Sequence, residues 1–372
     1  MNPNDPLYFD YAAAAPPYEE ALHYFTEIAA SYYANPSSRH AWGGSCREKL
    51  MEFKNQFCGA LGFPDGRLLL CASGTEANNT IVRGYLNMDP KGGILIAENV
   101  HDSIWFAAGL YSDRTEILTI DRYGIIDIDQ LRKALQKKPS LVCISHACNE
   151  TGSLQPVQEV AYLCHHHDVP LLVDGAQAIG HIPVILDEIP CAYYTFSAHK
   201  FGAPIGTGGA FIRDDKFGSL VHGGRQEWDL RAGTENLPGL AASLRALKIA
   251  NADMPDESMR LNELKAGLLS ELNDSGIRYL ENNAKDSLPG FLSISFPGLS
   301  GNEIVTALSL SGYSVSTGSA CHANTIEPPR VILAMGRTVA EATGTIRITM
   351  GRNTTKKAVQ GLRDAIIEFV NP

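Results

Sequence analysis

The hydrophobic residues of this chain gather into short runs that alternate with longer stretches of helical spacing. Between residues 66 and 212 these runs lie at residues 67–71, 94–97, 116–120, 141–145, 170–174, 193–197 and 208–212. The first run is followed by a helical stretch that ends near Leu86. Short continuous apolar runs between helices are typical of strands buried on both faces, so the pattern predicts an α/β domain with a mostly parallel, seven-stranded sheet.

The pattern changes after a glycine-rich stretch at residues 222–239. The later elements are expected to be one or two long helices over 240–275, strands at 291–296, 313–316 and 345–350, a helix from Asn302 and a final helix over 355–370. Such an arrangement is typical of an α+β layer and predicts a second, smaller domain. We place the large domain at residues 16–249 and the small domain at residues 1–15 and 250–372.

Composition narrows the class of protein. The chain has 372 residues, of which 44% are hydrophobic, and 31 basic residues stand against 41 acidic ones, a net charge of −10. The apolar share excludes a disordered chain, and an acidic chain without a basic cluster is a poor nucleic-acid binder. No apolar run approaches the ~18 residues that a membrane span needs, and the first residues resemble neither a secretory signal nor a transit peptide. We therefore expect a cytoplasmic protein that binds neither nucleic acid nor membrane.

The eight cysteines are scattered and form no CxxC pair, so they are expected to be reduced thiols. The run from Cys164 to His167 raises the question of a metal site. Adjacent histidines cannot share one face of a helix, however, and the usual zinc-ligand spacings are missing. A solvated helix end is the preferred interpretation, and no metal site is expected.

Polar residues follow several of the predicted strands, at the edge where parallel sheets bind ligands. Gly74 and Thr75 lie in the turn after the first strand, where free N–H groups and the helix dipole suit a phosphate; an ordinary turn with Thr75 as helix cap is the alternative. Asp174 ends the fifth strand and precedes Gln177, as a helix cap or as the partner of a protonated ligand nitrogen. Lys200 follows the sixth strand, as a surface lysine or as a desolvated Schiff-base lysine. Together, a phosphate cradle, an aspartate and a lysine match the needs of pyridoxal 5'-phosphate.

At this point the chain resembles the cysteine desulfurases of the class V aminotransferase-like group. The resemblance runs from Tyr8 to about Thr355, and its motifs lie at residues 9–13, 35–40, 74–79, 101, 149–152, 174–177, 197–200, 231–234, 318–321 and 346–347. It implies the fold type I of pyridoxal-phosphate-dependent transferases, that cofactor and a homodimer. Two departures occur: Ala72-Ser73 replaces the usual Ser-Gly, and Arg225 and Trp228 interrupt the usual Gly-Gly-Gly-x-Glu-Arg stretch.

The resemblance also implies roles for individual residues. Lys200 would bind the cofactor covalently and remove the substrate's Cα proton, His101 would stack on the cofactor ring and move protons, and Cys321 would accept the sulfur. Asn35 and Arg347 would hold the substrate carboxylate, a group that a guanidinium fork suits. The other cofactor contacts would come from Gly74, Thr75, Asn149, Asp174, Gln177, Ser197, His199 and, across the dimer interface, Thr234.

The activity implied by the resemblance is removal of sulfur from L-cysteine. L-alanine and a persulfide on Cys321 would form, and the sulfur would pass to an acceptor protein, as in iron–sulfur cluster assembly. A lone cysteine is usually a small buried residue, but the small residues before Cys321 indicate an exposed loop instead. Selenocysteine lyase remains an alternative, as does another class V lyase or aminotransferase. An inactive dimeric scaffold is the alternative of a different class, and the presence of Lys200 and Cys321 speaks against it.

Overall fold

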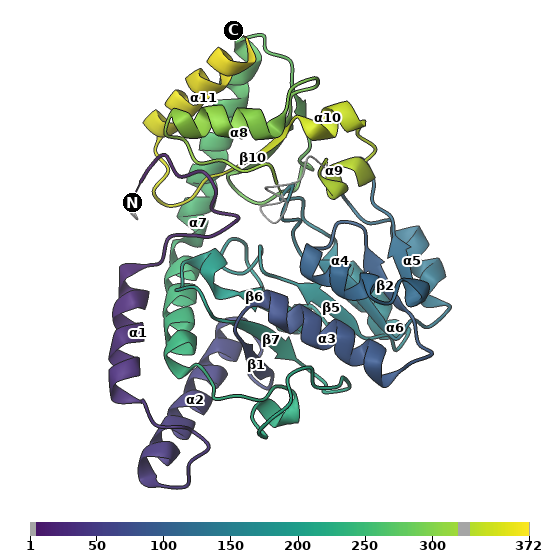
Figure 1. Cartoon of the computed structure of the whole chain (residues 1–372), viewed down its shortest axis with the longest axis vertical. Helices are drawn as coiled ribbons and strands as arrows, with labels where there is room; N and C mark the ends of the chain where they lie inside the picture. The colour runs from purple at the N-terminus through teal and green to yellow at the C-terminus, as the bar shows by residue number, and fades with distance from the viewer. Residues whose placement is uncertain (1–4, 319–327, 372) are drawn as a thin grey trace.

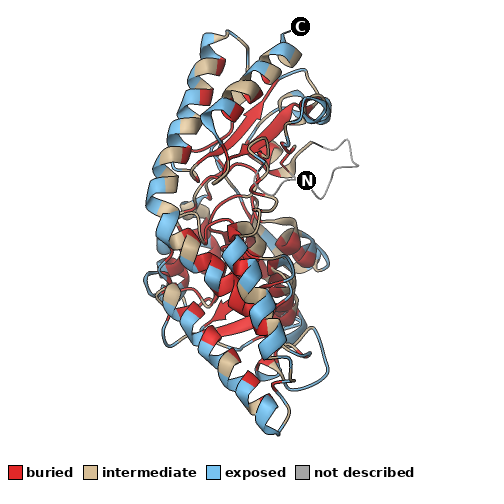
Figure 2. Cartoon of the chain, turned by 90° about the vertical axis from the view of Figure 1, so that its left-hand side faces the viewer, coloured by how far each residue is buried: buried red, intermediate tan, exposed pale blue. Residues whose placement is uncertain are grey.

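The structure is a computed structural model that describes residues 5–318 and 328–371. Figure 1 shows a large body built around one sheet, with a smaller layer above it that carries the C-terminus. In Figure 2 the buried residues gather around the strands of both parts and on the inner faces of the helices. The chain therefore has a separate hydrophobic core in each part.

The large sheet has seven strands in the order β1-β7-β6-β5-β4-β2-β3. They are β1 (Arg67–Cys71), β2 (Ile94–Ala97), β3 (Thr115–Leu118), β4 (Leu141–Ser145), β5 (Leu171–Asp174), β6 (Tyr193–Ser197) and β7 (Gly208–Ile212). Strand β7 is antiparallel to both of its neighbours, and the remaining pairs are parallel. The predicted fold class is confirmed, because continuous apolar runs could be buried on both faces only in a sheet that helices cover on each side.

Helices cover the two faces of this sheet (Figure 1). The helices of the large part are α1 (Glu19–Ser31), α2 (Ala41–Ala60), α3 (Gly74–Met88), α4 (Asp102–Gly109), α5 (Ile128–Leu135) and α6 (Val157–His166). The first half of α7 (Leu237–Asp274) packs in the same core, and α1 packs against α7. Short 3-10 helices lie at Ser112–Arg114, Leu186–Glu188, Ala198–Phe201 and Glu227–Asp229. In α3, buried Ala77, Ile81 and Tyr85 recur every four residues, which turns one stripe of the helix toward the sheet.

The smaller layer is built on a three-stranded antiparallel sheet in the order β10-β9-β8. Its elements are β8 (Leu280–Glu281), β9 (Phe291–Ser295), β10 (Thr345–Thr349), α8 (Gly301–Leu310), α9 (Arg330–Ala334), α10 (Val339–Thr343) and α11 (Lys356–Val370). The strand predicted at residues 313–316 is wrong. Ser314 bridges to Tyr8 and Ser316 bridges to Arg347, so neighbouring residues pair with different segments and no ladder forms.

One helix connects the two cores. Helix α7 (Leu237–Asp274) packs in the large core up to Ala250 and in the small core from Leu261 onward, and Pro255 lies between these two stretches. Phe9 also packs in the small core. The change of core within α7 lies close to residues 249 and 250, where we divided the chain, and that division stays a prediction.

Across residues 5–318 and 328–371, no helix is both long enough and apolar enough to cross a membrane.

Candidate active site

A cavity of about 180 Å3 lies at the carboxyl ends of the parallel strands. The predicted residues that line it are Gly74, Thr75, His101, Asn149, Asp174, Gln177, Ser197, His199 and Lys200. Ser73, Asn78, Ser103, Ser145, Ala147 and Ala176 also line it, without having been assigned a role from the sequence. Segments that are far apart in the chain therefore meet at the edge of the sheet where ligands were expected.

The first wall of the cavity is the turn into α3. Ser73 is the helix cap, since its hydroxyl accepts a hydrogen bond from the Glu76 N–H at 3.1 Å. The alternative of a Thr75 cap is therefore wrong by two residues, because Ser73 keeps an extended backbone and α3 begins directly after it. The Glu76 carboxylate accepts from the Ala72 N–H at 2.8 Å and pairs with Arg231 at 2.7 Å. The turn is fixed by side chains on both sides of it.

Close packing brings this turn against the end of β6. The Gly74 N–H donates to the Ser197 hydroxyl at 3.0 Å, and a Cβ on Gly74 would lie 2.6 Å from that oxygen. His199 follows Ser197, and burial lowers its pKa to about 4, with the charge of Lys200 acting in the same direction. A helix N-terminus, hydroxyl groups and a neutral imidazole N–H donor are suited to an anion such as a phosphate.

Asp174 also lines the cavity and is held by a buried network. Its Oδ2 accepts from the Asn78 side-chain amide at 2.9 Å, and its Oδ1 accepts from the Ala176 N–H at 3.0 Å. The Asn78 amide also donates to Ser103 at 2.9 Å and accepts from the Thr195 hydroxyl at 2.8 Å. Asn78 is 1% exposed. Its role was not predicted from the sequence, although a polar residue on the buried stripe of α3 was a signal for it.

His101 caps α4 and points its ring toward this network. Its Nδ1 accepts from the Ser103 N–H at 3.1 Å, which assigns the ring proton of the neutral form to Nε2. Burial lowers the pKa of His101, and the charge of Lys200 lowers it further, whereas Asp174 acts in the opposite direction. A neutral ring that can take up or release a proton is thus placed beside the cavity.

Lys200 lies on the 3-10 helix that follows β6. This helix is capped by Gly202, which has φ 87°. Its ammonium group donates to the backbone carbonyls of Ala12 at 2.6 Å and Ala13 at 2.8 Å. The Gln177 side chain donates to the same Ala12 carbonyl at 2.9 Å. The N-terminal segment, whose residues 9–13 form one of the motifs of the resemblance, therefore closes one side of the cavity through its backbone oxygens.

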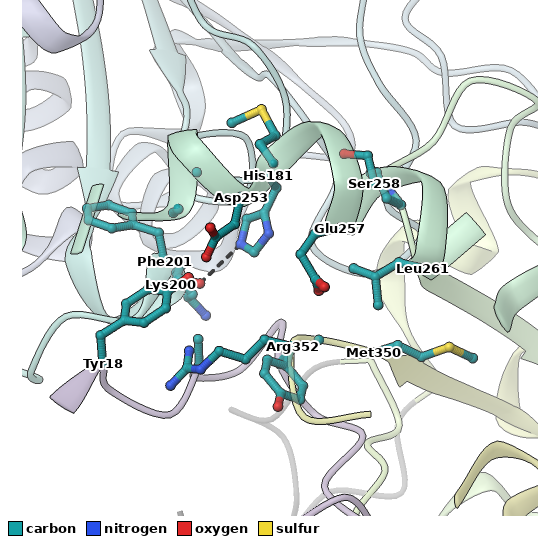
Figure 3. Close-up of a pocket in the computed structure, with 17 residues that line it drawn as sticks. Tyr18, His181, Lys200, Phe201, Asp253, Glu257, Ser258, Leu261, Met350 and Arg352 are labelled. Carbon is teal, nitrogen blue, oxygen red and sulfur yellow. Dashed lines mark hydrogen bonds between the residues drawn. The ribbon is translucent and has the colours of Figure 1, made fainter. Parts of the chain in front are cut away.

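A second, smaller cavity of about 70 Å3 lies behind Lys200, where α7 passes between the two cores. Figure 3 shows the His181 ring against the backbone of Lys200, with Arg352 across the cavity. His181 Nε2 lies 3.1 Å from the Lys200 carbonyl, and burial lowers the pKa of His181, so the neutral ring donates its Nε2 proton to that oxygen. Arg352 stacks on Tyr18 at 4.2 Å and donates to the Pro17 carbonyl at 3.0 Å. The His181 contact therefore holds the backbone of Lys200 from the side of this second cavity.

Arg347 is placed differently from the cavity residues. It is 3% exposed on β10 and does not line the 180 Å3 cavity. One of its Nη1 hydrogen bonds goes to the backbone carbonyl of Asn149, which does line the cavity, at 2.7 Å. The guanidinium therefore sits directly behind the wall of the site.

The other predicted site residues lie away from the cavity. Asn35 is exposed in the loop between α1 and α2, and Thr234 is exposed in the segment before α7. The two segments are neighbours, because the Gln226 side-chain amide lies 3.5 Å from the Ser37 hydroxyl. Cys321 lies outside the described residues.

The seven cysteines in the described part of the chain are buried. Burial raises the pKa of Cys58 to about 11 and that of Cys164 and Cys191 to about 12, and it also raises the pKa of Cys71. Such thiols stay protonated near neutral pH and are poor nucleophiles. Within residues 5–318 and 328–371, no group of three or more His, Cys, Asp or Glu residues is arranged to hold a metal ion.

Comparison with known proteins identifies the family of this chain. The profile of the family described as "Aminotransferase class-V" matches residues 7–362. The chain belongs to the class V aminotransferase family. It is 35% identical to the cysteine desulfurase IscS of Dictyoglomus turgidum over 98% of this chain and 94% of that protein. It is 29% identical to the cysteine desulfurase IscS of Methanosarcina thermophila over 99% and 92%.

A solved structure supports the same relationship. The chain resembles a "NifS-like protein" with a TM-score of 0.89 and 28% identity, covering 97% of this chain and 98% of the other. Membership of the class V family implies dependence on pyridoxal 5'-phosphate.

The donor set of the cavity fits that cofactor. The N-terminus of α3 with Ser197 and His199 would hold a phosphate. The buried carboxylate of Asp174 would pair with a protonated ring nitrogen, and the amine of Lys200 would bind an aldehyde. Gly74 leaves no room for a side chain at the phosphate end, as a closely approached anion site requires.

Proposed function

We propose that this protein is a cysteine desulfurase that uses pyridoxal 5'-phosphate to take sulfur from L-cysteine. The observation that carries the proposal is the single cavity that joins the α3 N-terminus, His101, Asp174 and Lys200, in a chain whose curated relatives are cysteine desulfurases. Relatives of that name act on L-cysteine. The cofactor supplies an electron sink for bond breaking next to the Cα of an amino acid.

The residues of the chain divide the remaining work. Asp174, fixed by Asn78, keeps the negative charge that a protonated ring nitrogen needs. Lys200 has the amine that takes the proton from the substrate Cα, and His101, neutral because of its buried position, carries its ring proton at Nε2 and can donate it. Arg347 holds the substrate carboxylate.

Cys321 is the proposed sulfur acceptor. Its thiolate attacks the substrate sulfur, so that the new S–S bond forms as the Cβ–S bond breaks, and the carbon fragment leaves as alanine after taking up protons. Two observations support this choice. The described thiols are buried, and the residues on either side of 319–327 are anchored near the site: the Gly318 carbonyl accepts from Arg347, and Arg330 binds the carbonyls of Glu98 and Val100.

A homodimer is part of the proposal. Asn35 and Thr234 lie on neighbouring exposed segments outside the chain's own cavity, where they are available to a second copy. The aromatic side chains of Tyr33 and Trp42 are 71% and 61% exposed and contact each other beside Asn35. Exposed aromatic residues are enriched at protein interfaces. As the sequence analysis predicted, the proposal also includes a cytoplasmic location and transfer of the sulfur to an acceptor protein.

The test is incubation of the purified, cofactor-loaded protein with L-cysteine, followed by measurement of alanine and sulfide and by mass spectrometry of the thiols. We expect stoichiometric alanine and a persulfide on Cys321. Cys321→Ser should still bind the cofactor but lose persulfide formation. Cys71→Ala, which removes the thiol beside the phosphate cradle, serves as the matched control and should keep Cys321 persulfidated.

Each failure points to a different error. A fully loaded protein that forms no alanine from L-cysteine contradicts the desulfurase proposal. Turnover of L-selenocysteine alone would identify a selenocysteine lyase. A persulfide on another residue, or normal turnover by Cys321→Ser, contradicts the role of Cys321 and leaves the fold and cofactor untouched.

A further inference from the structure

The guanidinium of Arg347 is already bound by the protein itself. Its Nη1 donates to the carbonyls of Asn149 and Gly318, both at 2.7 Å. Its Nη2 donates to the carboxylate of Asp10 at 2.8 Å, and its Nε is buried without a hydrogen-bond partner. A carboxylate ligand of the usual forked geometry needs the edge that Asp10 occupies.

Asp10 is the carboxylate paired with this buried cation. The side chain of Arg347 is 3% exposed, whereas that of Asp10 is 20% exposed, so Asp10 can be reached from solvent. The other acid near Arg347 is Glu150, which is buried and has one carboxylate oxygen without a partner. Burial raises the pKa of Glu150 to about 7, so Glu150 balances the charge of Arg347 only in part at neutral pH.

We propose that the Asp10 carboxylate occupies the place of the substrate carboxylate on Arg347 until an amino-acid substrate displaces Asp10. This inference rests on the proposed function, because it takes Arg347 as the carboxylate site. Two carboxylates cannot share one guanidinium edge without repulsion, so binding of the substrate and release of Asp10 are one exchange. Asp10 is thus a positioning and specificity-determining residue.

A short segment of backbone connects Asp10 with the acceptors of the Lys200 amine. The Asp10 carbonyl accepts from the N–H groups of Ala13 and Ala14, which ties the segment into a turn. The same turn presents the carbonyls of Ala12 and Ala13 to Lys200 Nζ. Movement of Asp10 away from Arg347 therefore alters the acceptors of the Lys200 amine.

The first test compares a ligand that has a carboxylate with one that lacks it. L-alanine and ethylamine are both primary amines, and only L-alanine can displace Asp10. Calorimetry on the cofactor-loaded Asp10→Asn variant should show L-alanine binding tighter by about two- to fivefold, the range for a partly exposed ion pair, with ethylamine unchanged. The KM for L-cysteine should fall by the same factor with little change in kcat. Asp5→Asn, on the same segment but bonded to the Leu7 N–H, is the matched control and should behave like wild type.

The second test uses the wild-type protein, so it does not depend on the folding of a variant. Hydrogen exchange of the amides of residues 9–14 should become faster when L-alanine binds and should not change with ethylamine. Equal or weaker L-alanine binding by Asp10→Asn, or exchange that is the same with both ligands, overturns the inference. Failure of wild type to release alanine from L-cysteine would instead contradict the proposed function, so the two outcomes are distinguishable.

Discussion

The two sides of the candidate site are built on different principles. On the cofactor side, the Asn78 side chain holds Asp174, which faces the cavity, and the side chains of Ser73 and Glu76 fix the turn that forms the cavity wall. On the substrate side, the cationic groups of Lys200 and Arg347 are bound by the N-terminal segment. The first side is preorganised for a resident group, whereas the cationic groups of the second already have internal partners, and our proposal is that a substrate replaces Asp10.

This difference indicates how the cofactor and the substrate would each use their binding free energy. A cofactor that enters a preformed cradle requires little rearrangement, so its affinity should depend on how well the cradle is held. Under our proposal, a substrate that displaces Asp10 from Arg347 uses part of its binding free energy for that exchange. The predictions below test each side separately, from the largest expected effect to the smallest.

Lys200 belongs to both sides, so Lys200→Ala should have the largest effect. We expect turnover to fall by a factor on the order of 10³ or more, because no amine remains to move the Cα proton. Borohydride reduction should fix the cofactor to the wild-type protein and not to the variant, as mass spectrometry would show. Lys216→Ala, a substitution beyond the end of β7, is the control. Retention of half the wild-type turnover by Lys200→Ala would rule out the proposed role.

Asn78→Ala should damage the cofactor side. It removes the donor to Asp174 and leaves buried groups without partners, so the free energy of unfolding should fall by about 3 kcal/mol. Cofactor affinity should fall with it, while the KM for L-cysteine should hardly move. Urea unfolding and cofactor titration measure the two effects. Asn79→Ala, next in the chain and bound only to backbone carbonyls, should show a much smaller loss in both.

Glu150→Gln tests the substrate side through pH. The folded protein keeps the Glu150 proton up to a pKa of about 7, whereas the unfolded chain releases it near its ordinary value. Wild-type stability should therefore fall as pH rises from about 4.5 to 7, by up to about 3 kcal/mol, and Glu150→Gln should lack this loss. Unfolding free energies at pH 5 and pH 8 give the difference. Glu159→Gln, an exposed substitution on α6, should follow wild type; a pH slope for Glu150→Gln equal to that of wild type would be the contrary result.

Thr234→Ala should have the smallest effect, and only in a dimer. One hydrogen bond from the partner's Thr234 to the phosphate would be lost, so cofactor affinity should fall by about tenfold. Thr306→Ala, on the exposed face of α8, is the matched control. Analytical ultracentrifugation should show a dimer for both variants. An active wild-type monomer with full cofactor affinity would contradict the composite site.

The cofactor side was largely predictable because it follows from local pattern. Apolar runs located the strands, and the residues directly after them, such as Asp174 and Lys200, had to lie at the ligand-binding edge. The position of the helix cap was missed, since both Ser73 and Thr75 are good capping residues and only the backbone conformation separates them. Asn78 could have been found, because it interrupts an otherwise apolar stripe of α3.

The substrate side could not be derived in the same way. The contacts of Ala12 and Ala13 with Lys200 use backbone oxygens, which every residue has, and they join positions that are 188 and 187 residues apart. The pair of Asp10 and Arg347 spans 337 residues, and no periodicity links them. The failed strand at residues 313–316 has the same origin, because its partners lie at opposite ends of the chain.

The proline in α7 makes one turn of this helix easier to bend than the others. Pro255 has no N–H group, so the helix lacks the hydrogen bond that would tie this turn to the one before it, and bending is easiest there. The bend point falls after the last large-core residue of the helix, Ala250, and before the first small-core residue, Leu261. The turn that lacks this hydrogen bond therefore lies between the two cores, so a local bend of α7 at this turn need not unpack the residues that the helix contributes to either core.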